Sequence, residues 1–335
     1  MNVIAITGGG TAGHVIPNLA LIPELKPCFD KIIYLGWKSP ENRLISLANI
    51  PFFSVRAAKY ERQKFFTNLK IPGSLVIGIT KALIILKREN VTIVFSKGGY
   101  VSLPVCIAAG LLRIPIVIHE SDFSLGLASK VMAPFAKLII TSFPETKGDI
   151  YIGNPVRQEI LNGKAEVIKS KYNFDNKPIV LIIGGSSGSR DINNAVYPIV
   201  KQLTIKYNII HITGNDYTKI IQNGYVGISY SDNISDIYAA SDIIVTRGGA
   251  NCLSECAALG KRTLCIPLPR GRSRGDQIEN AMSYKKRGCV RVLEQKDLTP
   301  SKLLMEIDAT YYSNQPHATD SNVAPTIVKE ILNIL

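Results

Sequence analysis

The chain has 335 residues, of which 46% are hydrophobic, and its 39 Lys and Arg side chains outnumber its 26 Asp and Glu side chains, for a formal net charge of +13. This composition excludes a disordered basic tail, a single small module and a multi-span membrane protein. Residues 1–157 carry 18 basic and 9 acidic side chains, whereas residues 158–335 carry 21 and 17. We therefore expect an acidic partner to contact mainly the first half.

Cysteine usage, the N-terminal residues and the length of the apolar runs indicate in which cellular compartment the protein lies. The N-terminus begins directly with a strand-like run and lacks the basic and apolar segments of a signal peptide. No uninterrupted apolar run reaches about 18 residues, so no bilayer-spanning segment is predicted. The cysteines form no C-x-x-C pair and most lie in apolar runs, which indicates buried thiols of a cytosolic protein; they are Cys28, Cys106, Cys252, Cys256, Cys265 and Cys289.

Short runs rich in Val and Ile alternate with longer segments of helical spacing. Apolar strands of this kind are typical of parallel sheets covered by helices on both faces. Turn residues separate two such series, so the predicted fold is α/β with two Rossmann-like domains, 1–157 and 158–322, and a C-terminal helix in 323–335 that packs back on the first domain. The strand-like runs are 3–7, 31–36, 92–96, 114–119 and 137–142, then 178–185, 208–214, 242–247 and 262–267.

The first strand-like run is followed by the glycine-rich segment GGGTAGH. Gly8, Gly10 and Gly13 have the G-x-G-x-x-G spacing, which brings backbone N–H groups and a helix N-terminus close to a phosphate. An NAD site would also need an acid about 20 residues on, at the end of the second strand. The first acid after that strand is Glu41, which lies inside the start of a helix and not at the strand end, and this counts against an NAD site. His14 is a candidate general base, or alternatively it only caps the helix.

A second glycine-rich segment, GGSSG, follows the first strand of the second half. It can wrap a phosphate in the same way. It also fits the G-x-S-x-G pattern of a hydrolase nucleophile elbow, with Ser186 as the nucleophile. That alternative needs a downstream histidine, and the candidates are His211, within an expected strand, and His317, in a polar segment. We favour the phosphate loop.

The segment 241–269 combines a strand end, a glycine turn and a helix start. A helix that begins near Asn251 aims its N-terminus at a diphosphate. Glu255, one turn inside that helix, is placed to bind a pair of sugar hydroxyls, or alternatively only favours the helix dipole. The next helix carries Gln277 and Asn280 at i and i+3, so both amides share one face and can bind sugar hydroxyls. Three arginines precede this helix and either bind phosphate or belong to a solvated loop; they are Arg270, Arg272 and Arg274.

Polar side chains also follow two strand-like runs of the first half. Lys97 and Tyr100 come after one run, and His119 and Glu120 end the next. Because the carboxyl ends of parallel strands line the ligand site of an open sheet, we expect these side chains to lie near His14.

Six motifs, in order from residue 4 to about residue 282, together resemble the MurG family of N-acetylglucosaminyltransferases. They are GGGTAGHVIPNLALI, SKGGYVSLPVCIAA, HESDFSLGLASK, GNPVR, GGSSGSRDIN and TRGGANCLSECAALGK with DQIENA. The resemblance implies the glycosyltransferase B-type fold, with two Rossmann-like domains facing across a cleft. It also implies an inverting transfer of N-acetylglucosamine from UDP-N-acetylglucosamine, held mainly by the second domain. The acceptor is the C4 hydroxyl of the muramyl sugar of lipid I, held by the first domain, and the product is lipid II.

The resemblance also implies roles for single residues. His14 is the catalytic base, with Glu120 as its partner or rival, and Lys97 and Tyr100 bind the acceptor together with His14. Glu255 takes the ribose diol. The donor-binding residues that it implies are Thr11, Ala12, Gly13, Asp122, Arg157, Ser186, Ser231, Ala250, Asn251, Leu253, Ser254, Glu255, Gln277 and Asn280.

Three positions depart from the residues usual in the family. Ala12 replaces a glycine, which is tolerated where φ is negative. Asp122 replaces an asparagine and so exchanges a donor-acceptor amide for an acceptor. Asp276 stands where His or Gln is usual. These departures bear on sugar recognition and leave the family assignment unchanged.

Residues 56–88 combine eight basic side chains and one acid with many apolar residues. A helix buried along one stripe is one interpretation of the apolar residues. A surface that contacts anionic lipid explains the apolar and the basic residues together. The predicted membrane contacts are Phe65, Phe66, Leu69, Leu75, Leu111 and Leu112.

The sequence thus predicts a peripheral enzyme at the cytoplasmic face of the cell membrane. Its expected partners are UDP-N-acetylglucosamine, lipid I and an anionic membrane surface, without a cofactor, a metal or nucleic acid. The alternative is another glycosyltransferase or an epimerase of the same fold that uses a nucleotide sugar.

Overall fold

A computed structural model describes residues 1–10, 12–37, 41–46, 48–58, 71–185, 187–271, 273–315 and 323–335. The chain forms two units, unit 1 from Met1–Arg157 with Asn322–Leu335, and unit 2 from Gln158–Ser321. Seven residues with predicted roles lie outside the described residues: Thr11, Phe65, Phe66, Leu69, Ser186, Arg272 and His317.

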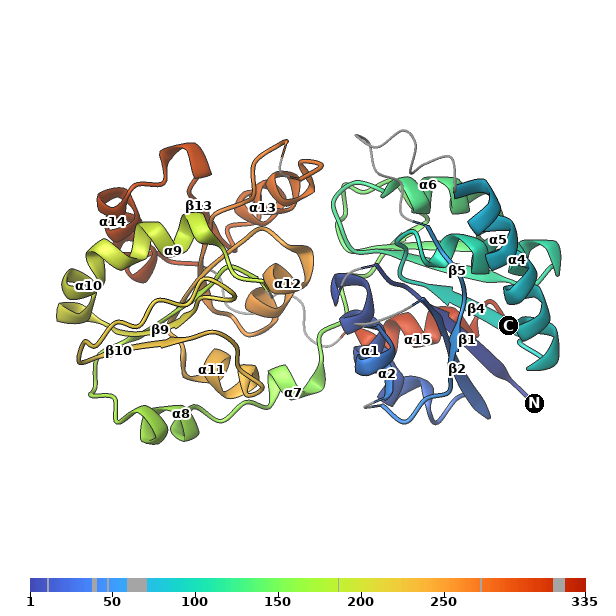
Figure 1. Ribbon diagram of the computed structural model, residues 1–335, viewed down its shortest axis with the longest axis horizontal. Coiled ribbons are helices and arrows are strands. Elements are labelled where there is room, and N and C mark those ends of the chain that lie inside the picture. Colours follow the sequence, from blue (N-terminus) through green and yellow to red (C-terminus); the bar gives the residue numbers. More distant parts are fainter. Residues whose placement is uncertain are drawn as a thin grey trace. The chain divides into compact units, whose positions relative to one another are not determined.

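Unit 1 is built on a seven-stranded parallel sheet (Figure 1). The strand order is β3-β2-β1-β4-β5-β6-β7, which changes direction between β1 and β4. In doubly wound sheets, ligands bind beyond the carboxyl ends of the strands at such a point. The strands are β1 (Val3–Thr7), β2 (Lys31–Gly36), β3 (Phe52–Ser54), β4 (Ile93–Ser96), β5 (Ile116–Glu120), β6 (Leu138–Thr141) and β7 (Ile150–Tyr151).

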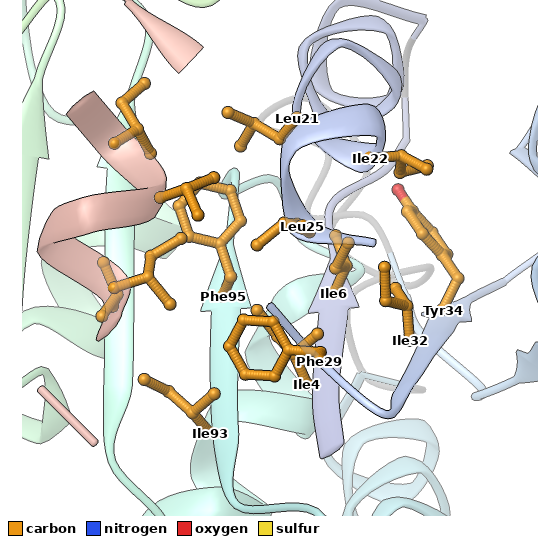
Figure 2. Close-up of a cluster of buried hydrophobic side chains, with 14 of the residues drawn as sticks. Ile4, Ile6, Leu21, Ile22, Leu25, Phe29, Ile32, Tyr34, Ile93 and Phe95 are labelled. Carbon is orange, nitrogen blue, oxygen red and sulfur yellow. The ribbon is translucent and has the colours of Figure 1, made fainter. Parts of the chain in front are cut away.

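Helices cover both faces of this sheet, because successive side chains of each buried strand point to opposite faces. Ile4 and Ile6 of β1 enter the core cluster under α1 (Figure 2), and Val3 and Ala5 enter the cluster under α4 and α5. The helices of unit 1 are α1 (Ala12–Leu25), α2 (Glu41–Ser46), α4 (Ile71–Arg88), α5 (Ser102–Leu111), α6 (Leu127–Met132), the 3-10 turn η1 (Ala133–Phe135) and α15 (Ala324–Leu332).

The last helix, α15, packs against α1 although more than 290 residues separate them (Figure 1). Ile327, Val328 and Ile331 of α15 join Leu21 and Leu25 of α1 in one buried cluster. The chain therefore returns to unit 1 after it has built unit 2.

Unit 2 repeats the architecture with a six-stranded parallel sheet of order β10-β9-β8-β11-β12-β13. In Figure 1, α9 and α10 lie on one face of this sheet, and α8 and α11 lie on the other. The strands are β8 (Ile179–Ile183), β9 (Asn208–Ile212), β10 (Tyr225–Ile228), β11 (Ile243–Thr246), β12 (Arg262–Cys265) and β13 (Arg291–Val292). The helices are α7 (Gln158–Leu161), α8 (Ala165–Tyr172), α9 (Arg190–Val196), η2 (Tyr197–Ile199), α10 (Val200–Lys206), α11 (Ile234–Ala240), α12 (Ala250–Ala258), α13 (Asp276–Lys286), η3 (Gln295–Asp297) and α14 (Pro300–Tyr311).

The predicted fold class of two Rossmann-like α/β domains is confirmed. Four strands were not predicted from the sequence, β3, β7, β10 and β13, and they are the outer strands of the two sheets. Most of their side chains are only half-buried, so these strands lack the continuous apolar runs that identify the central strands. Within the described parts of the chain, no helix has the length and apolarity needed to cross a membrane. All six cysteines are free, and four of them are buried.

Candidate functional site

Two glycine-rich loops of unit 1 meet beyond the carboxyl ends of β1 and β4. Gly10 has a φ of +93°, and a Cβ on it would collide with the ring of Tyr100. Gly99 has a φ of +81°, and a Cβ there would lie 3.3 Å from Nδ1 of His14. Glycine is required at both positions, because the conformation is left-handed and the neighbouring loop is close. The structure thus places His14 and Tyr100 together, as the motifs predicted.

Two buried polar residues support the first glycine loop from below. The hydroxyl of Tyr34 on β2 donates to the Gly8 carbonyl. The amide Nδ2 of Asn18 on α1 donates to the His14 carbonyl at 3.2 Å and to the Tyr34 hydroxyl at 3.1 Å. Neither residue was predicted to have a role. Each is a polar side chain in an otherwise apolar strand or helix stripe, and such a position indicates a buried hydrogen bond.

Lys97, predicted to bind the acceptor, is buried at the end of β4 with 1% of its surface exposed. Its Nζ donates to Nδ1 of His119 at 2.5 Å and to Oδ1 of Asn154 at 3.0 Å. Nε2 of His119 donates to the Gly153 carbonyl at 2.8 Å, so the His119 proton is on Nε2. Burial lowers the pKa of Lys97 to about 7, against the opposing charges of Glu120 and Asp122. Burial, and then the charge of Lys97, hold the pKa of His119 well below its usual value.

The buried ammonium of Lys97 makes the stability of unit 1 depend on pH. Between the folded pKa of about 7 and the ordinary value of 10.5, the unfolded chain binds a proton that the folded chain does not. Stability relative to Lys97→Met therefore rises with pH in this window, by about 2 kcal/mol from pH 7 to pH 9. Urea unfolding followed by the fluorescence of Trp37, the single tryptophan, measures this change.

Lys87→Met is the matched control for Lys97→Met, since Lys87 is an exposed lysine of α4. Its stability difference from the wild type is expected to be the same at both pH values. A difference for Lys97→Met that is also constant between pH 7 and pH 9 contradicts the prediction.

Glu120, predicted as the partner or rival of His14, is buried at the end of β5. Its Oε1 accepts the Asp122 N–H at 3.3 Å, and its Oε2 accepts the Gly126 N–H at 3.0 Å. Both carboxylate oxygens therefore hold the loop that leads into α6. This arrangement favours a positioning role for Glu120 over a role as base.

The strand-turn-helix unit predicted near residue 250 is present in unit 2. Helix α12 begins at Ala250, directly after the Gly248–Gly249 turn, and its first N–H groups have no intrahelical partner. The side chains of Ala250 and Leu253 are buried in the core, so a donor contact from either uses the backbone. Glu255 lies in the second turn of α12 and is 8% exposed.

The two predicted sugar-binding amides of α13 bond different loops, Asn280 the glycine turn before α12 and Gln277 the loop after β12. Nδ2 of Asn280 donates to the Gly248 carbonyl at 3.1 Å, and Asn280 is fully buried. Oε1 of Gln277 accepts the Leu268 N–H at 3.0 Å. A Cβ on Gly248 would collide with the backbone of Gln277. The two amides thus lie at the predicted turn, and their contacts to a sugar stay a prediction.

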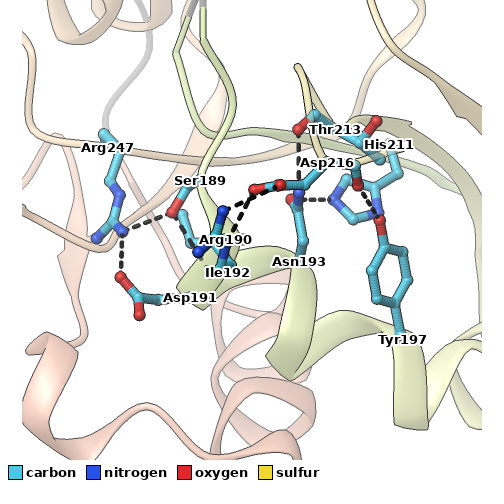
Figure 3. A network of polar contacts seen from close by, with 10 residues as sticks. All are labelled: Ser189, Arg190, Asp191, Ile192, Asn193, Tyr197, His211, Thr213, Asp216 and Arg247. Atoms are coloured by element: carbon cyan, nitrogen blue, oxygen red, sulfur yellow. Dashed lines mark hydrogen bonds and ion pairs between the residues drawn. The ribbon is translucent and has the colours of Figure 1, made fainter. Parts of the chain in front are cut away.

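The second glycine loop also packs closely on a neighbouring strand end. Gly188 has a φ of +79°, and a Cβ there would collide with the Thr213 carbonyl. Behind it, Nε2 of His211 contacts Oδ1 of Asn193 at 3.0 Å (Figure 3). Nδ1 of His211 contacts the Tyr225 hydroxyl at 3.0 Å. Burial lowers the pKa of His211 to about 4. Both ring nitrogens are occupied, so His211 cannot serve the hydrolase alternative.

A buried guanidinium at the same edge of unit 2 was missed by the sequence analysis. Arg247 follows β11, and its Nη2 donates to Oγ of Ser189 at 2.5 Å and lies 3.5 Å from a carboxylate oxygen of Asp191 (Figure 3). Its Nη1 donates to the Ile266 carbonyl at 3.1 Å and to Oε1 of Gln295 at 2.7 Å. No local spacing signals this network, because its members lie up to 58 residues apart in the sequence.

The other predicted donor-binding residues are spread over helices and loops of both units. Oγ of Ser231 accepts the Asn233 N–H at 3.1 Å before α11, and Ser254 pairs with the Tyr284 hydroxyl at 2.9 Å between α12 and α13. Arg157 is half-buried at the end of unit 1. Gly13 and Asn251 lie in the first turns of α1 and α12, and Ala12 opens α1. Asp122 is half-buried in the loop after β5. Their roles stay predictions.

Helix α4 divides its large apolar residues between a buried stripe and an exposed face. The buried stripe consists of Ser74, Gly78, Ala82, Ile85 and Leu86, and a Cβ on Gly78 would collide with the backbone of Arg56. A buried stripe therefore accounts for only part of the apolar residues of this helix. The exposed apolar side chains on α4, α5, α6 and η1 are Val76, Ile77, Ile84, Leu111, Leu127, Val131 and Phe135, which we call the α4–α6 surface.

Of the predicted membrane contacts that the structure describes, Leu111 is the most exposed, at 66%. Leu75 and Leu112 are half-buried, and Leu112 packs against the core cluster beneath α4 and α5. The roles of Leu75 and Leu112 as membrane contacts stay predictions. Among the described residues, no group of three or more His, Cys, Asp and Glu side chains has an arrangement that could hold a metal.

Two Rossmann-like units, each with a glycine loop and a helix start at the carboxyl edge of its sheet, are the architecture of glycosyltransferases that use activated sugars. The model of the glycosyltransferase family 28 N-terminal domain matches residues 4–141, and that of the C-terminal domain matches residues 179–333. The solved structure of Acinetobacter baumannii MurG superposes with a TM-score of 0.75 at 24% identity, over 99% of each chain. A glycosyltransferase of kitacinnamycin superposes with a TM-score of 0.72 at 13% identity, over 99% of this chain and 94% of its own.

Curated relatives show closer similarity in sequence. The UDP-N-acetylglucosamine–N-acetylmuramyl-(pentapeptide) pyrophosphoryl-undecaprenol N-acetylglucosamine transferase of Clostridium kluyveri is 43% identical, over 91% of this chain and 90% of its own length. The transferase of the same name from Clostridium novyi is 39% identical, over 99% and 97%. The chain therefore belongs to the MurG family within glycosyltransferase family 28, and the family predicted from the motifs is confirmed.

Proposed function

We propose that the chain transfers N-acetylglucosamine from UDP-N-acetylglucosamine to the C4 hydroxyl of the muramyl sugar of lipid I, forming lipid II with inversion at the anomeric carbon. The observation that carries the proposal is the 39–43% identity, over more than nine-tenths of the chain, to transferases named for this reaction. The two edges described above supply the groups that such a transfer requires.

Unit 1 supplies the acceptor side of the proposed reaction. His14 takes the proton of the C4 hydroxyl as its oxygen attacks the anomeric carbon, which is general-base catalysis. Tyr100 packs on the same glycine loop, and the buried side chain of Lys97 lies beside it. Glu120 holds the loop after β5 through both carboxylate oxygens. We assign the base to His14 and a positioning role to Glu120.

Unit 2 supplies the donor side. The bond from the anomeric carbon to the diphosphate breaks, and UDP leaves with the bonding electron pair. The N–H groups at the start of α12 and the glycine loop after β8 stabilise the negative charge of the diphosphate. Glu255, one turn further along α12, accepts hydrogen bonds from the ribose diol. Gln277 and Asn280 lie beside the same turn, where they bind the sugar.

Release of UDP in the presence of different acceptors tests this function. UDP release from UDP-N-acetylglucosamine is expected only when a lipid-linked muramyl acceptor is supplied. Release with a free sugar as the acceptor would favour the alternative of a soluble glycosyltransferase. Formation of an isomeric nucleotide sugar without any acceptor would favour an epimerase.

We also propose that the enzyme binds the cytoplasmic face of the cell membrane through the α4–α6 surface. Helices α4, α5 and α6 pack in succession and carry no acidic residue, and exposed lysines accompany their apolar side chains. Apolar side chains beside basic ones favour insertion at an anionic lipid surface. The exposed basic residues of this region include Lys81, Lys87, Arg113, Lys130 and Lys137.

Replacing two apolar side chains of this surface is expected to weaken vesicle binding. Ile77→Ser with Leu111→Ser should lower partitioning onto anionic vesicles by about tenfold or more, since each exposed aliphatic side chain contributes about 1 kcal/mol on insertion. Vesicle sedimentation measures the change, and transfer to a water-soluble short-chain acceptor should be unaffected. Ile205→Ser, at an exposed isoleucine of unit 2, is the matched control. The role would be refuted if the double variant and Ile205→Ser lost vesicle binding equally. It would also be refuted if the wild-type enzyme bound neutral and anionic vesicles equally.

A further inference from the structure

We propose that Arg247 is a positioning residue of the donor site. Its guanidinium sets the spacing between the glycine loop that ends at Gly188 and the N-terminus of α12, so that both can bind one diphosphate. Arg247 does this without touching the donor. The inference rests on the proposed placement of the donor on unit 2.

The contacts of Arg247 join four loops at one edge of the sheet. Ser189 follows the glycine loop after β8, Ile266 follows β12, and Gln295 opens η3 after β13. Arg247 itself follows β11, so one side chain connects the loops after four neighbouring strands. Loops lack the ladder hydrogen bonds that set distances within a sheet, so cross-links of this kind determine their relative positions.

Ser189 connects Arg247 to the start of α9. Its Oγ accepts the Ile192 N–H at 3.4 Å as the N-cap of that helix, and it also accepts from Arg247. A shift of the guanidinium therefore moves the cap together with the glycine loop before it. On the other side of the turn, Asn280 holds the Gly248 carbonyl, so the start of α12 is held from two directions.

The burial and the shape of the guanidinium explain why this position needs arginine. The Arg247 side chain is 8% exposed, and Ser189, Ile266 and Gln295 offer it neutral oxygens. A carboxylate oxygen of Asp191 lies 3.5 Å from its Nη2 and partly balances the charge. A buried cation is tolerated where its protons are hydrogen-bonded. The planar fork of arginine reaches separate acceptors at fixed angles, which the single ammonium of lysine cannot do.

Arg247→Met and Arg247→Lys test the proposal in the full-length enzyme. Misplaced N–H groups lose hydrogen bonds to the charged diphosphate, so we expect the Kd for UDP and the KM for UDP-N-acetylglucosamine to rise by about 10- to 100-fold. The KM for the lipid-linked acceptor should be unchanged, and kcat at saturating donor should fall less than the donor KM rises. Arg291→Met is the control, because it removes another guanidinium of unit 2, one that pairs with Glu306 at 2.7 Å.

Variants of Gln295 test the positioning role of Arg247 if the Arg247 variants do not fold. Gln295→Ala removes one half-buried acceptor of Arg247 and is expected to raise the Kd for UDP a few-fold. Gln295→Glu keeps an acceptor oxygen and should restore the wild-type Kd. Equal values for Gln295→Ala and Gln295→Glu would then overturn the proposal.

Two further outcomes of the Arg247 measurements overturn the proposal. One is a wild-type Kd for UDP in a folded Arg247 variant, and the other is an equal rise in the KM of both substrates. Glu255→Ala separates this failure from a failure of the proposed function. If Glu255→Ala weakens UDP binding and the Arg247 variants do not, only the positioning role is wrong. If none of them does, the donor is not held on this edge of unit 2.

Discussion

His14→Ala is expected to lower kcat by about 100- to 10,000-fold, the usual contribution of a general base. The acceptor hydroxyl must lose its proton as it attacks, and His14 lies at the start of α1 beside the loop of Gly99. The backbone of His14 is held independently of its ring, because Asn18 bonds its carbonyl. Removing the ring should therefore leave the fold and the KM for UDP-N-acetylglucosamine unchanged. Steady-state kinetics with both substrates varied measures this.

Glu120→Gln is the informative comparison for His14→Ala. An amide keeps one acceptor oxygen but presents N–H groups where the carboxylate accepts the N–H of Asp122 or Gly126. The loop after β5 should loosen, and the KM for the acceptor should rise more than kcat falls. A larger loss of kcat for Glu120→Gln than for His14→Ala would indicate that Glu120 is the base and that His14 has the positioning role.

Glu255→Ala is expected to weaken the binding of UDP by about 10- to 100-fold, because a hydrogen bond to a charged group contributes about 1.5–3 kcal/mol. Glu255 lies in the second turn of α12, one turn beyond the N–H groups proposed to hold the diphosphate. Isothermal titration with UDP measures the loss.

Binding of 2′-deoxy-UDP shows whether the loss comes from the ribose. If Glu255 accepts from the 2′-hydroxyl, Glu255→Ala should weaken 2′-deoxy-UDP less than it weakens UDP, since the two changes remove the same interaction. Glu294→Ala, at an exposed acid after β13, should leave both ligands unaffected. Equal losses of UDP and 2′-deoxy-UDP for Glu255→Ala would contradict the assignment.

The doubly wound fold could be predicted because each central strand carries its own signal. A parallel strand buried on both faces must be apolar throughout, as in 3–7 and 179–183. The glycine-rich loops were likewise visible, because the left-handed φ of Gly10 and Gly188 restricts the residue type at single positions. These are local requirements, and a local pattern records them.

The surface of α4 shows where local pattern was insufficient. Its apolar residues fitted either a stripe buried in the core or an exposed surface, and the structure divides them: Ile85 and Leu86 are buried, whereas other large apolar side chains of the helix are exposed. Close approach to α5 and to the backbone of Arg56 requires a small residue at Gly78. Which face of a helix is buried depends on its neighbour, which the helix sequence does not contain.

By itself, the sequence determined the family, the two-domain α/β architecture and the loops that carry the site, because those depend on residue type at short spacing. Only the tertiary structure decided which side chains hold those loops in place. Lys97 meets Asn154 across 57 residues, and Arg247 meets Ser189 across 58. Such contacts arise where the ends of different strands come together at one edge of a sheet, and the strand order that unites them is a property of the whole fold.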